Sequence, residues 1–169
     1  MMLWSGPVLP LAALIWPLVL GFAMVLPPLW AHALRLLPLA PLPALMLALL
    51  GQADETAAPM LLLGLRLAID ESTRLLLGMT AGLWLAAGLF AQSMTGGRNL
   101  APFAGFWCLT LTGNLGVFLA ADVITFYAAF ATVSLAAWFL VVHDRTPAAF
   151  RAGWLYIVLA VLGEVCLLM

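Results

Sequence analysis

Six long apolar runs, separated by short segments that hold most of the charged residues, constrain the fold of this chain more than any other feature. A helix needs about 20 mostly apolar residues to cross a bilayer. The sequence therefore predicts an all-α, polytopic membrane protein with about six transmembrane helices. These helices are expected at residues 3–26, 30–50, 75–91, 100–121, 123–142 and 148–169.

The composition supports this class and excludes the main alternatives. Apolar residues make up 66% of the 169 residues, and charged residues make up 8%. A soluble domain is usually about half apolar and about a quarter charged, so this chain has too few charges to cover a water-exposed surface. A disordered chain is excluded as well, because such chains are richer in charge. A membrane β-barrel does not fit either, because its strands alternate apolar and polar residues in segments of about ten residues, whereas these apolar runs are long and continuous. The net charge of −1 gives no sign of a nucleic-acid partner.

The runs differ in how clearly they predict a straight helix. The second run is rich in proline, so we expect this helix to be kinked or re-entrant. The polar segment at residues 52–74 is predicted to lie outside the membrane, and its short apolar stretch at residues 60–67 suits a hairpin or a surface segment. The sixth run still continues at Met169, which favours a piece of a longer protein or part of a split subunit.

The positions of the arginines predict the orientation. The chain contains no lysine, and the cytoplasmic loops of membrane proteins carry an excess of basic residues. An N-terminus outside the cell places four arginines inside and two outside. We therefore expect this orientation in the cell's inner (cytoplasmic) membrane. The inside set is Arg35, Arg98, Arg145 and Arg151, and the outside set is Arg66 and Arg74.

One acidic residue lies deep in a predicted transmembrane helix. Glu164 follows the segment 147–149 by about 15 residues, or about 22 Å along a helix. An ionisable side chain at such a depth is costly and marks a functional site by default. Glu164 is therefore a candidate proton carrier. A structural hydrogen bond, or a position at the outer interface, would also account for it.

Two other ionisable residues lie at the ends of the fifth predicted helix. Asp122 begins this helix, where it either caps the first turn or belongs to an access path for protons or cations. His143 follows the other end, where it either passes protons between water and the membrane or is simply solvated.

Several polar residues in the fourth and fifth predicted helices are candidates for lining a hydrated channel. Isolated Ser and Thr residues in membrane helices also bond to their own backbone or across helices, so both interpretations remain open. These residues are Thr110, Thr112, Asn114, Thr125, Thr132 and Ser134.

The sequence predicts no catalytic site, no cofactor and no metal. It contains no phosphate-binding loop, dinucleotide-binding motif, zinc-protease motif or nucleophile elbow. Cys108 and Cys166 lie in apolar runs without the spacing of a disulfide or metal pair. His32 and His143 lie near run ends, whereas haem between helices requires buried histidines.

Four segments carry a resemblance to a known family. They are Leu63–Leu75 (LGLRLAIDESTRL), Leu83–Ala91 (LWLAAGLFA), Asn114–Asp122 (NLGVFLAAD) and Phe126–Ala136 (FYAAFATVSLA). In this order they resemble the proton-translocating, antiporter-like membrane subunits of respiratory complex I, membrane-bound hydrogenases and multisubunit cation/proton antiporters. The resemblance covers about residues 60–169. It implies the N-terminal part of a subunit with about fourteen helices in two inverted bundles.

The sequence departs from the family pattern at one important position. Ala131 stands where the family carries a glutamate in the fifth helix, and the family's functional lysines lie in helices beyond Met169. Two interpretations follow. The carboxylate has moved to Glu164, or the subunit has lost translocation and serves as a scaffold.

The resemblance implies a proton-translocating subunit of a larger complex-I-like or antiporter-like assembly, with other membrane subunits and the lipid bilayer as its partners. The resemblance implies no catalytic site of its own, although such a subunit can belong to a proton-translocating oxidoreductase complex. A structural assembly subunit and a subunit of a proton-driven inorganic-carbon uptake complex are the alternatives. A single deep carboxylate, Glu164, favours H⁺ over Na⁺ as the transported ion.

Overall fold

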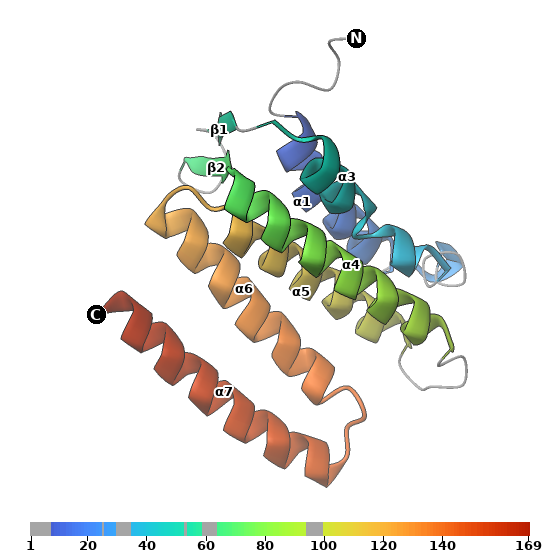
Figure 1. The fold of residues 1–169 in the computed structure, drawn as a ribbon. Coiled ribbons are helices and arrows are strands. Elements are labelled where there is room, and N and C mark those ends of the chain that lie inside the picture. Colours follow the sequence, from blue (N-terminus) through green and yellow to red (C-terminus); the bar gives the residue numbers. More distant parts are fainter. Residues whose placement is uncertain (1–7, 25, 30–34, 53, 59–63, 94–99) are drawn as a thin grey trace.

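The computed structural model describes residues 8–24, 26–29, 35–52, 54–58, 64–93 and 100–169. Helices account for most of these residues, and a two-stranded hairpin lies at one end of the bundle (Figure 1). The α-helices are α1 (Val8–Ala23), α3 (Leu42–Leu50), α4 (Glu71–Ser93), α5 (Leu100–Leu119), α6 (Val123–Val141) and α7 (Pro147–Leu168). The strands are β1 (Asp54–Ala58) and β2 (Leu65–Ile69), and short 3₁₀ turns lie at Pro27–Leu29 and Leu37–Leu39.

The predicted class, a helical polytopic membrane protein, is confirmed. Among the described residues, four helices are long and apolar enough to cross a membrane, namely α4, α5, α6 and α7. They correspond to the third to sixth predicted runs. Helices α4, α6 and α7 leave most of their residues unburied. Apolar residues therefore cover much of the outer surface, as a bilayer requires.

Within the described residues, the first two apolar runs contain shorter helices than the sequence predicts; residues 3–7 and 25 of the first run lie outside the described part. Within the run at 3–26, α1 has 16 residues and contains the buried Pro17. Within the run at 30–50, the described part is divided between a 3₁₀ turn and α3, which has nine residues and begins directly after Pro41. Proline lacks the N–H that a continuous helix requires, which explains the break. Residues 30–34 of the second run lie outside the described residues.

Helix α4 begins four residues earlier than predicted, inside the polar segment. Its first turn is capped by Asp70, whose Oδ1 accepts a hydrogen bond of 2.6 Å from the Thr73 amide. The Arg74 side chain donates from Nε to the carbonyl of Ala48 near the end of α3, at 3.1 Å. Such a cation satisfies carbonyls at a helix C-terminus. Two charged residues of this polar stretch thus stabilise helix ends: Asp70 caps the start of α4, and Arg74 bonds to the end of α3.

The rest of the polar segment folds as an antiparallel hairpin. Asp54 pairs with Ile69, and Ala58 pairs with Leu65. Along β2 the side chains alternate, because Leu65, Leu67 and Ile69 are buried while Arg66 is exposed. This period of two lets one face of the strand pack on the helices.

Helix α5 forms the centre of the bundle. It packs against α1, α4 and α6, and its buried residues include Leu111, Leu115 and Cys108. Glycines bring α5 and α6 together: a Cβ on Gly113 would lie 2.8 Å from the Val133 amide, and one on Gly116 would lie 2.9 Å from the Ala129 Cβ. Small residues allow membrane helices to approach this closely.

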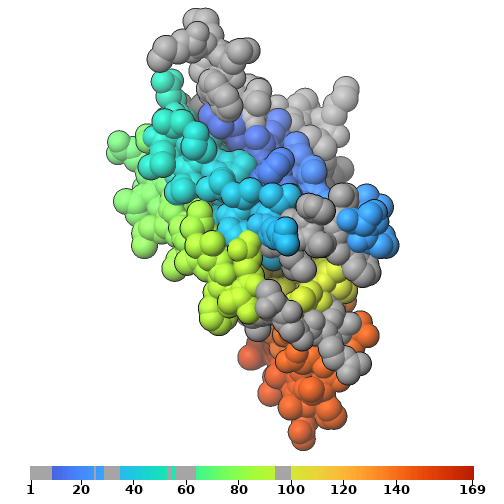
Figure 2. Space-filling view, turned by 90° about the vertical axis from the view of Figure 1, so that its right-hand side faces the viewer, coloured from blue at the N-terminus to red at the C-terminus, as the bar shows by residue number. Residues whose placement is uncertain are grey.

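Helix α7 packs against α6 at the edge of the bundle (Figure 1). In the turn between them, Arg145 has a φ of 54°, which is uncommon for a residue other than glycine. In the side view of Figure 2, the α6–α7 turn, in orange, projects beyond the surface formed by α1, α3 and α4.

Candidate functional site

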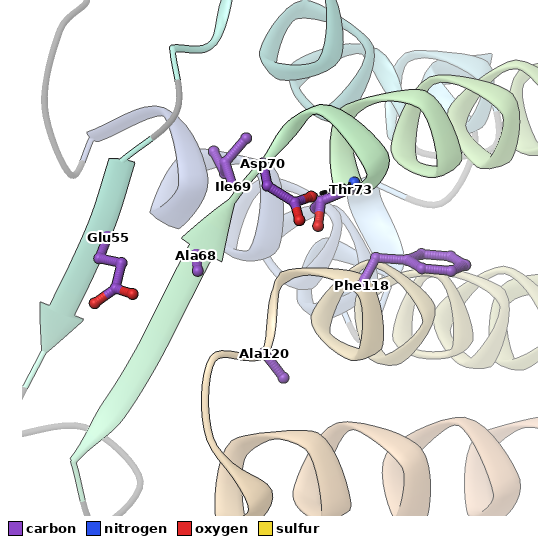
Figure 3. Close-up of a pocket in the computed structure, with 7 residues that line it drawn as sticks. All are labelled: Glu55, Ala68, Ile69, Asp70, Thr73, Phe118 and Ala120. Carbon is purple, nitrogen blue, oxygen red and sulfur yellow. Dashed lines mark hydrogen bonds between the residues drawn. The ribbon is translucent and has the colours of Figure 1, made fainter.

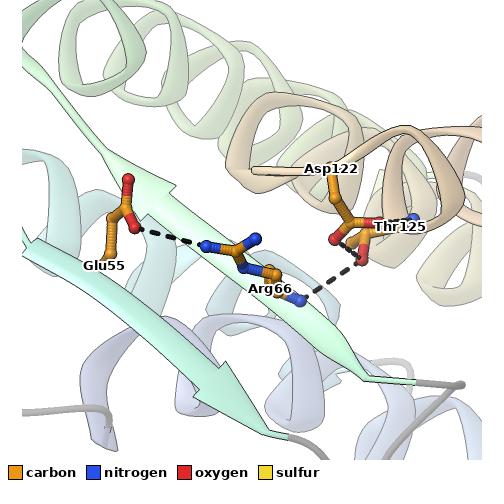
Figure 4. A network of polar contacts seen from close by, with 4 residues as sticks. All are labelled: Glu55, Arg66, Asp122 and Thr125. Atoms are coloured by element: carbon orange, nitrogen blue, oxygen red, sulfur yellow. Dashed lines mark hydrogen bonds and ion pairs between the residues drawn. The ribbon is translucent and has the colours of Figure 1, made fainter.

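The hairpin is attached to the α5–α6 turn through the backbone of Arg66 (Figure 4). The Ala121 amide donates to the Arg66 carbonyl at 2.9 Å, and the Arg66 amide donates to Thr125 Oγ1 at 3.3 Å. Leu67 also forms a β-bridge with Ala120. The residues joined by these bonds lie far apart in the sequence. Through them, the hairpin covers the end of the bundle at which α5 ends and α6 begins.

Asp122 is the N-cap of α6. Its carboxylate accepts a bond of 2.9 Å from the Thr125 amide and one of 2.6 Å from the Thr125 hydroxyl. These hydrogen bonds favour the charged form and hold the pKa of Asp122 below its usual value. The carboxylate is therefore ionised at neutral pH. Asp122 therefore has the geometry of a helix cap. A role in an access path for protons or cations remains a proposal.

An open pocket of about 510 Å³ lies where the hairpin meets α4 and α5 (Figure 3). Two carboxylates line it: Asp70, whose hydrogen bonds with Thr73 lower its pKa, and Glu55. Glu55 also lies 3.8 Å from the Arg66 guanidinium, and both side chains are largely exposed. An exposed pair of this kind contributes little to stability. The pocket places negative charge at the hairpin end of the molecule.

Four of the five hydroxyl groups predicted to line a channel bond to carbonyls of their own helices. Each of the four donates to the carbonyl four residues earlier: Thr110 to Phe106 at 2.8 Å, Thr112 to Cys108 at 3.0 Å, Thr132 to Ala128 at 2.8 Å, and Ser134 to Phe130 at 3.1 Å. The fifth, Thr125, donates to the Asp122 carboxylate. Asn114 is half-buried on α5. These bonds satisfy the hydroxyl protons but leave the oxygen lone pairs available to water. A hydrated path along these residues remains a proposal.

His143 lies at the opposite end of α6 from Asp122. Its Nδ1 is 2.8 Å from the Leu140 carbonyl, and its Nε2 is 3.1 Å from the Asp144 carboxylate. The imidazole also packs against the Phe103 ring, with the ring centroids 5.2 Å apart. Both ring nitrogens thus lie within hydrogen-bond distance of an acceptor.

Glu164 lies on the side of α7 that faces α6. Gly153 marks that side, because a Cβ there would lie 2.4 Å from Val142 Cγ1 and 3.1 Å from Trp138 Nε1. Eleven residues are close to three full turns of a helix, so Glu164 lies almost directly above Gly153. The exposure pattern agrees, since α7 has few residues that are not exposed. They are Ala149, Gly153, Tyr156, Ile157, Ala160, Gly163 and Glu164.

Glu164 and Ala131 lie at a similar depth. Gly153 is level with residues 138–142 of α6, which runs antiparallel to α7. Moving eleven residues along both helices, about 16 Å, brings Glu164 level with about residue 129. On α6, Ala131 is seven residues from Trp138 and so lies on the α7-facing side. Glu164 therefore approaches from α7 the region into which a side chain at position 131 would project.

The seam between α6 and α7 is tight at one end and open at the other. At Gly153 no side chain fits without a shift, whereas a Cβ on Gly163, next to Glu164, would meet nothing within 4 Å. Near the tight end, Trp138 Nε1 is buried without a hydrogen-bond partner in the described part of the chain. In the sequence, Tyr156 reads as an aromatic residue near a run end, where interfacial aromatics collect, and nothing singles out Trp138, although its spacing of seven residues from Ala131 places both on one side of α6.

The cysteines and histidines are the remaining candidates for metal or redox chemistry. Within the described residues, no group of three or more His, Cys, Asp or Glu side chains could hold a metal ion. Cys108 is buried in α5 and Cys166 is exposed near the end of α7, and both are free thiols. His32 lies outside the described residues.

The fold and the apolar helices define a multi-pass helical membrane protein. No protein-family model and no curated protein sequence matches the chain. Among solved structures, it is similar to a chain of the membrane-bound sulfane sulfur reductase, an archaeal respiratory membrane complex. The TM-score is 0.66 and the identity is 21% over 94% of this chain. The match covers 34% of the other chain, so this sequence spans about a third of its length. The similarity is one of fold.

Proposed function

We propose that this chain contributes antiporter-like helices to a proton-translocating membrane subunit of a larger, respiratory-type complex, with Glu164 as its protonatable centre. The observation that carries the proposal is the position of Glu164. Of the seven acidic residues in the sequence, it is the one in the interior of a membrane-spanning helix, and it faces a neighbouring helix. The similar fold of a subunit from an archaeal respiratory membrane complex supports membership in a complex.

The three candidate proton carriers lie at different depths along α6 and α7. Asp122 and His143 lie at the two ends of α6, and Glu164 lies between them in depth on α7. Protons would pass between Glu164 and water at the two membrane faces. A cationic side chain of another helix or partner subunit would favour the ionised carboxylate on approach and release its proton, and withdrawal would reverse this. The orientation follows the arginine distribution, with the hairpin outside the cell.

A structural role without ion movement is the second candidate. It is favoured by Ala131 at the position of the family's glutamate, and by the hydroxyls of Thr110, Thr132 and Ser134, which bond to their own helices. In this case Glu164 would serve as a hydrogen-bonding partner of another helix during assembly.

The test is Glu164→Gln in the complete complex. Glutamine keeps the size and hydrogen-bonding capacity of the side chain but cannot release a proton at physiological pH. The complex is purified, reconstituted into liposomes containing a pH-sensitive dye, and given a potassium diffusion potential. We expect proton uptake to fall to the level of liposomes without protein while the subunit composition stays unchanged.

Glu71→Gln is the matched control, because Glu71 begins α4 at the membrane surface and should leave proton uptake unchanged. Unchanged uptake in Glu164→Gln with intact assembly would reject the proposal in favour of the structural role. Measuring sodium uptake in the same liposomes, under the same potassium diffusion potential, separates H⁺ from Na⁺ as the transported ion.

A further inference from the structure

We propose that Tyr156 is a second proton-relaying side chain, which connects Glu164 with the His143 end of the α6–α7 seam. This inference rests on the proposed function and adds a residue to its path. Of the α7 residues that are not exposed, only Tyr156 and Glu164 carry a polar side chain; the rest are Ala, Gly and Ile. On the α7 side of this seam, these two groups and water between them are therefore the candidates for carrying a proton.

The spacing suits a relay. Tyr156 lies three residues beyond Gly153, or about 4.5 Å along α7, and about 12 Å before Glu164. Both side chains lean towards the N-terminal end of α7, so the distance along the helix between their polar ends remains of this order. No direct hydrogen bond joins them, so water would complete the connection.

The chemistry of a phenol also suits this position. A Tyr hydroxyl donates one hydrogen bond and accepts another, so it can pass a proton on while receiving one, without carrying a charge itself. A neutral relay avoids the cost of a second ion inside the membrane. The adjacent α6 residue Trp138 adds an N–H donor that is buried without a partner at the same crossing. Such donors usually find water or another acceptor, which supports a hydrated seam here.

The test is Tyr156→Phe in the complete complex, measured in the same liposomes as Glu164→Gln. Phenylalanine keeps the ring and removes only the hydroxyl. We expect proton uptake to fall several-fold, its dependence on pH to change, and the subunit composition to stay unchanged. The matched control is Trp154→Phe, because Trp154 is 69% exposed on the opposite side of α7; it should leave both the rate and the pH profile unchanged.

The outcomes separate this inference from the proposed function. If Glu164→Gln stops proton uptake while Tyr156→Phe keeps the wild-type rate and pH profile, Tyr156 is not a relay, but Glu164 retains its role. If Tyr156→Phe loses uptake only in proportion to a loss of assembled complex, the hydroxyl serves packing and the inference is wrong. If Glu164→Gln has no effect on uptake, both proposals fail.

Discussion

Thr125 stabilises two features of the fold: the start of α6 and the attachment of the hairpin. Its amide and hydroxyl hold the Asp122 carboxylate at the start of α6, and its oxygen accepts the Arg66 amide of the hairpin. The sequence predicts the cap, because Asp before an apolar run is a frequent helix start. It does not predict the hairpin contact, because Arg66 and Thr125 are 59 residues apart and no local pattern joins them.

The lowered pKa of Asp122 predicts a stability that depends on pH. The folded-state pKa lies below the ordinary value of about 4, so the stabilisation is present above that value and is lost as the pH falls through the folded pKa. We expect Thr125→Val to lower the thermal unfolding temperature more at pH 7 than near pH 2, where only the loss of the Arg66 hydrogen bond remains. Thermal unfolding of the detergent-solubilised protein at both pH values measures this.

Thr132→Val is the control for this prediction. Its hydroxyl bonds to the Ala128 carbonyl and to no carboxylate, so its effect on the unfolding temperature should be the same at both pH values. An effect of Thr125→Val that is equally large at pH 2 and pH 7 would contradict the linkage to Asp122.

At the scale of helices, hydropathy was sufficient to predict α4 to α7 but not the shorter helices that precede them. Long apolar runs identify transmembrane helices because every backbone group must be paired inside lipid. Pro41 breaks the second run, and the extent of the break depends on packing against α4. Likewise, the sequence shows Glu164 but not the helix that it faces, because this depends on how Gly153 contacts Trp138.

The glycine contacts between α5 and α6 give a prediction for this packing. Replacing a helical glycine by alanine normally favours the helix by about 1 kcal/mol. At Gly113 the new Cβ would lie 2.8 Å from the Val133 amide and 3.0 Å from the Ala129 carbonyl, and such overpacking costs about 1–3 kcal/mol. We expect Gly113→Ala to destabilise the protein in thermal unfolding.

Gly82 on α4 provides the matched control, because a Cβ there would meet nothing within 4 Å. Gly82→Ala should be neutral or stabilising. Equal unfolding temperatures for Gly113→Ala and Gly82→Ala would show that α6 moves away from α5 at no cost, contrary to this prediction.

At the scale of the whole molecule, the fold divides the charged residues between two ends. The hairpin and the α5–α6 turn form one end, and the α6–α7 turn forms the other (Figure 1). Glu55, Asp70 and Asp122 lie at the first end, and Arg145 and Asp144 at the second. The arginine distribution alone predicted an orientation. Because these two ends lie at opposite ends of the long helices (Figure 1), either orientation places them on opposite faces of the membrane.

Labelling with a membrane-impermeant maleimide tests the orientation. In a protein with Cys166 replaced by serine, we expect Glu55→Cys to react in intact cells and Asp144→Cys to react only after permeabilisation. Both positions are suitable because their side chains are 74% and 69% exposed. The reverse labelling pattern would place the hairpin inside the cell. Labelling of both positions from one face would contradict the transmembrane arrangement.

The turn between α6 and α7, in which Arg145 has a left-handed backbone conformation, sets the direction in which α7 leaves α6. Glu164 lies about 28 Å along α7 from this turn, and the close contact of α7 with α6 at Gly153 lies near the start of the helix. Over such a length, a difference of about 10° in the direction of α7 corresponds to about 5 Å at Glu164. The position of Glu164 relative to α6 therefore depends on the geometry of the turn and of the Gly153 contact.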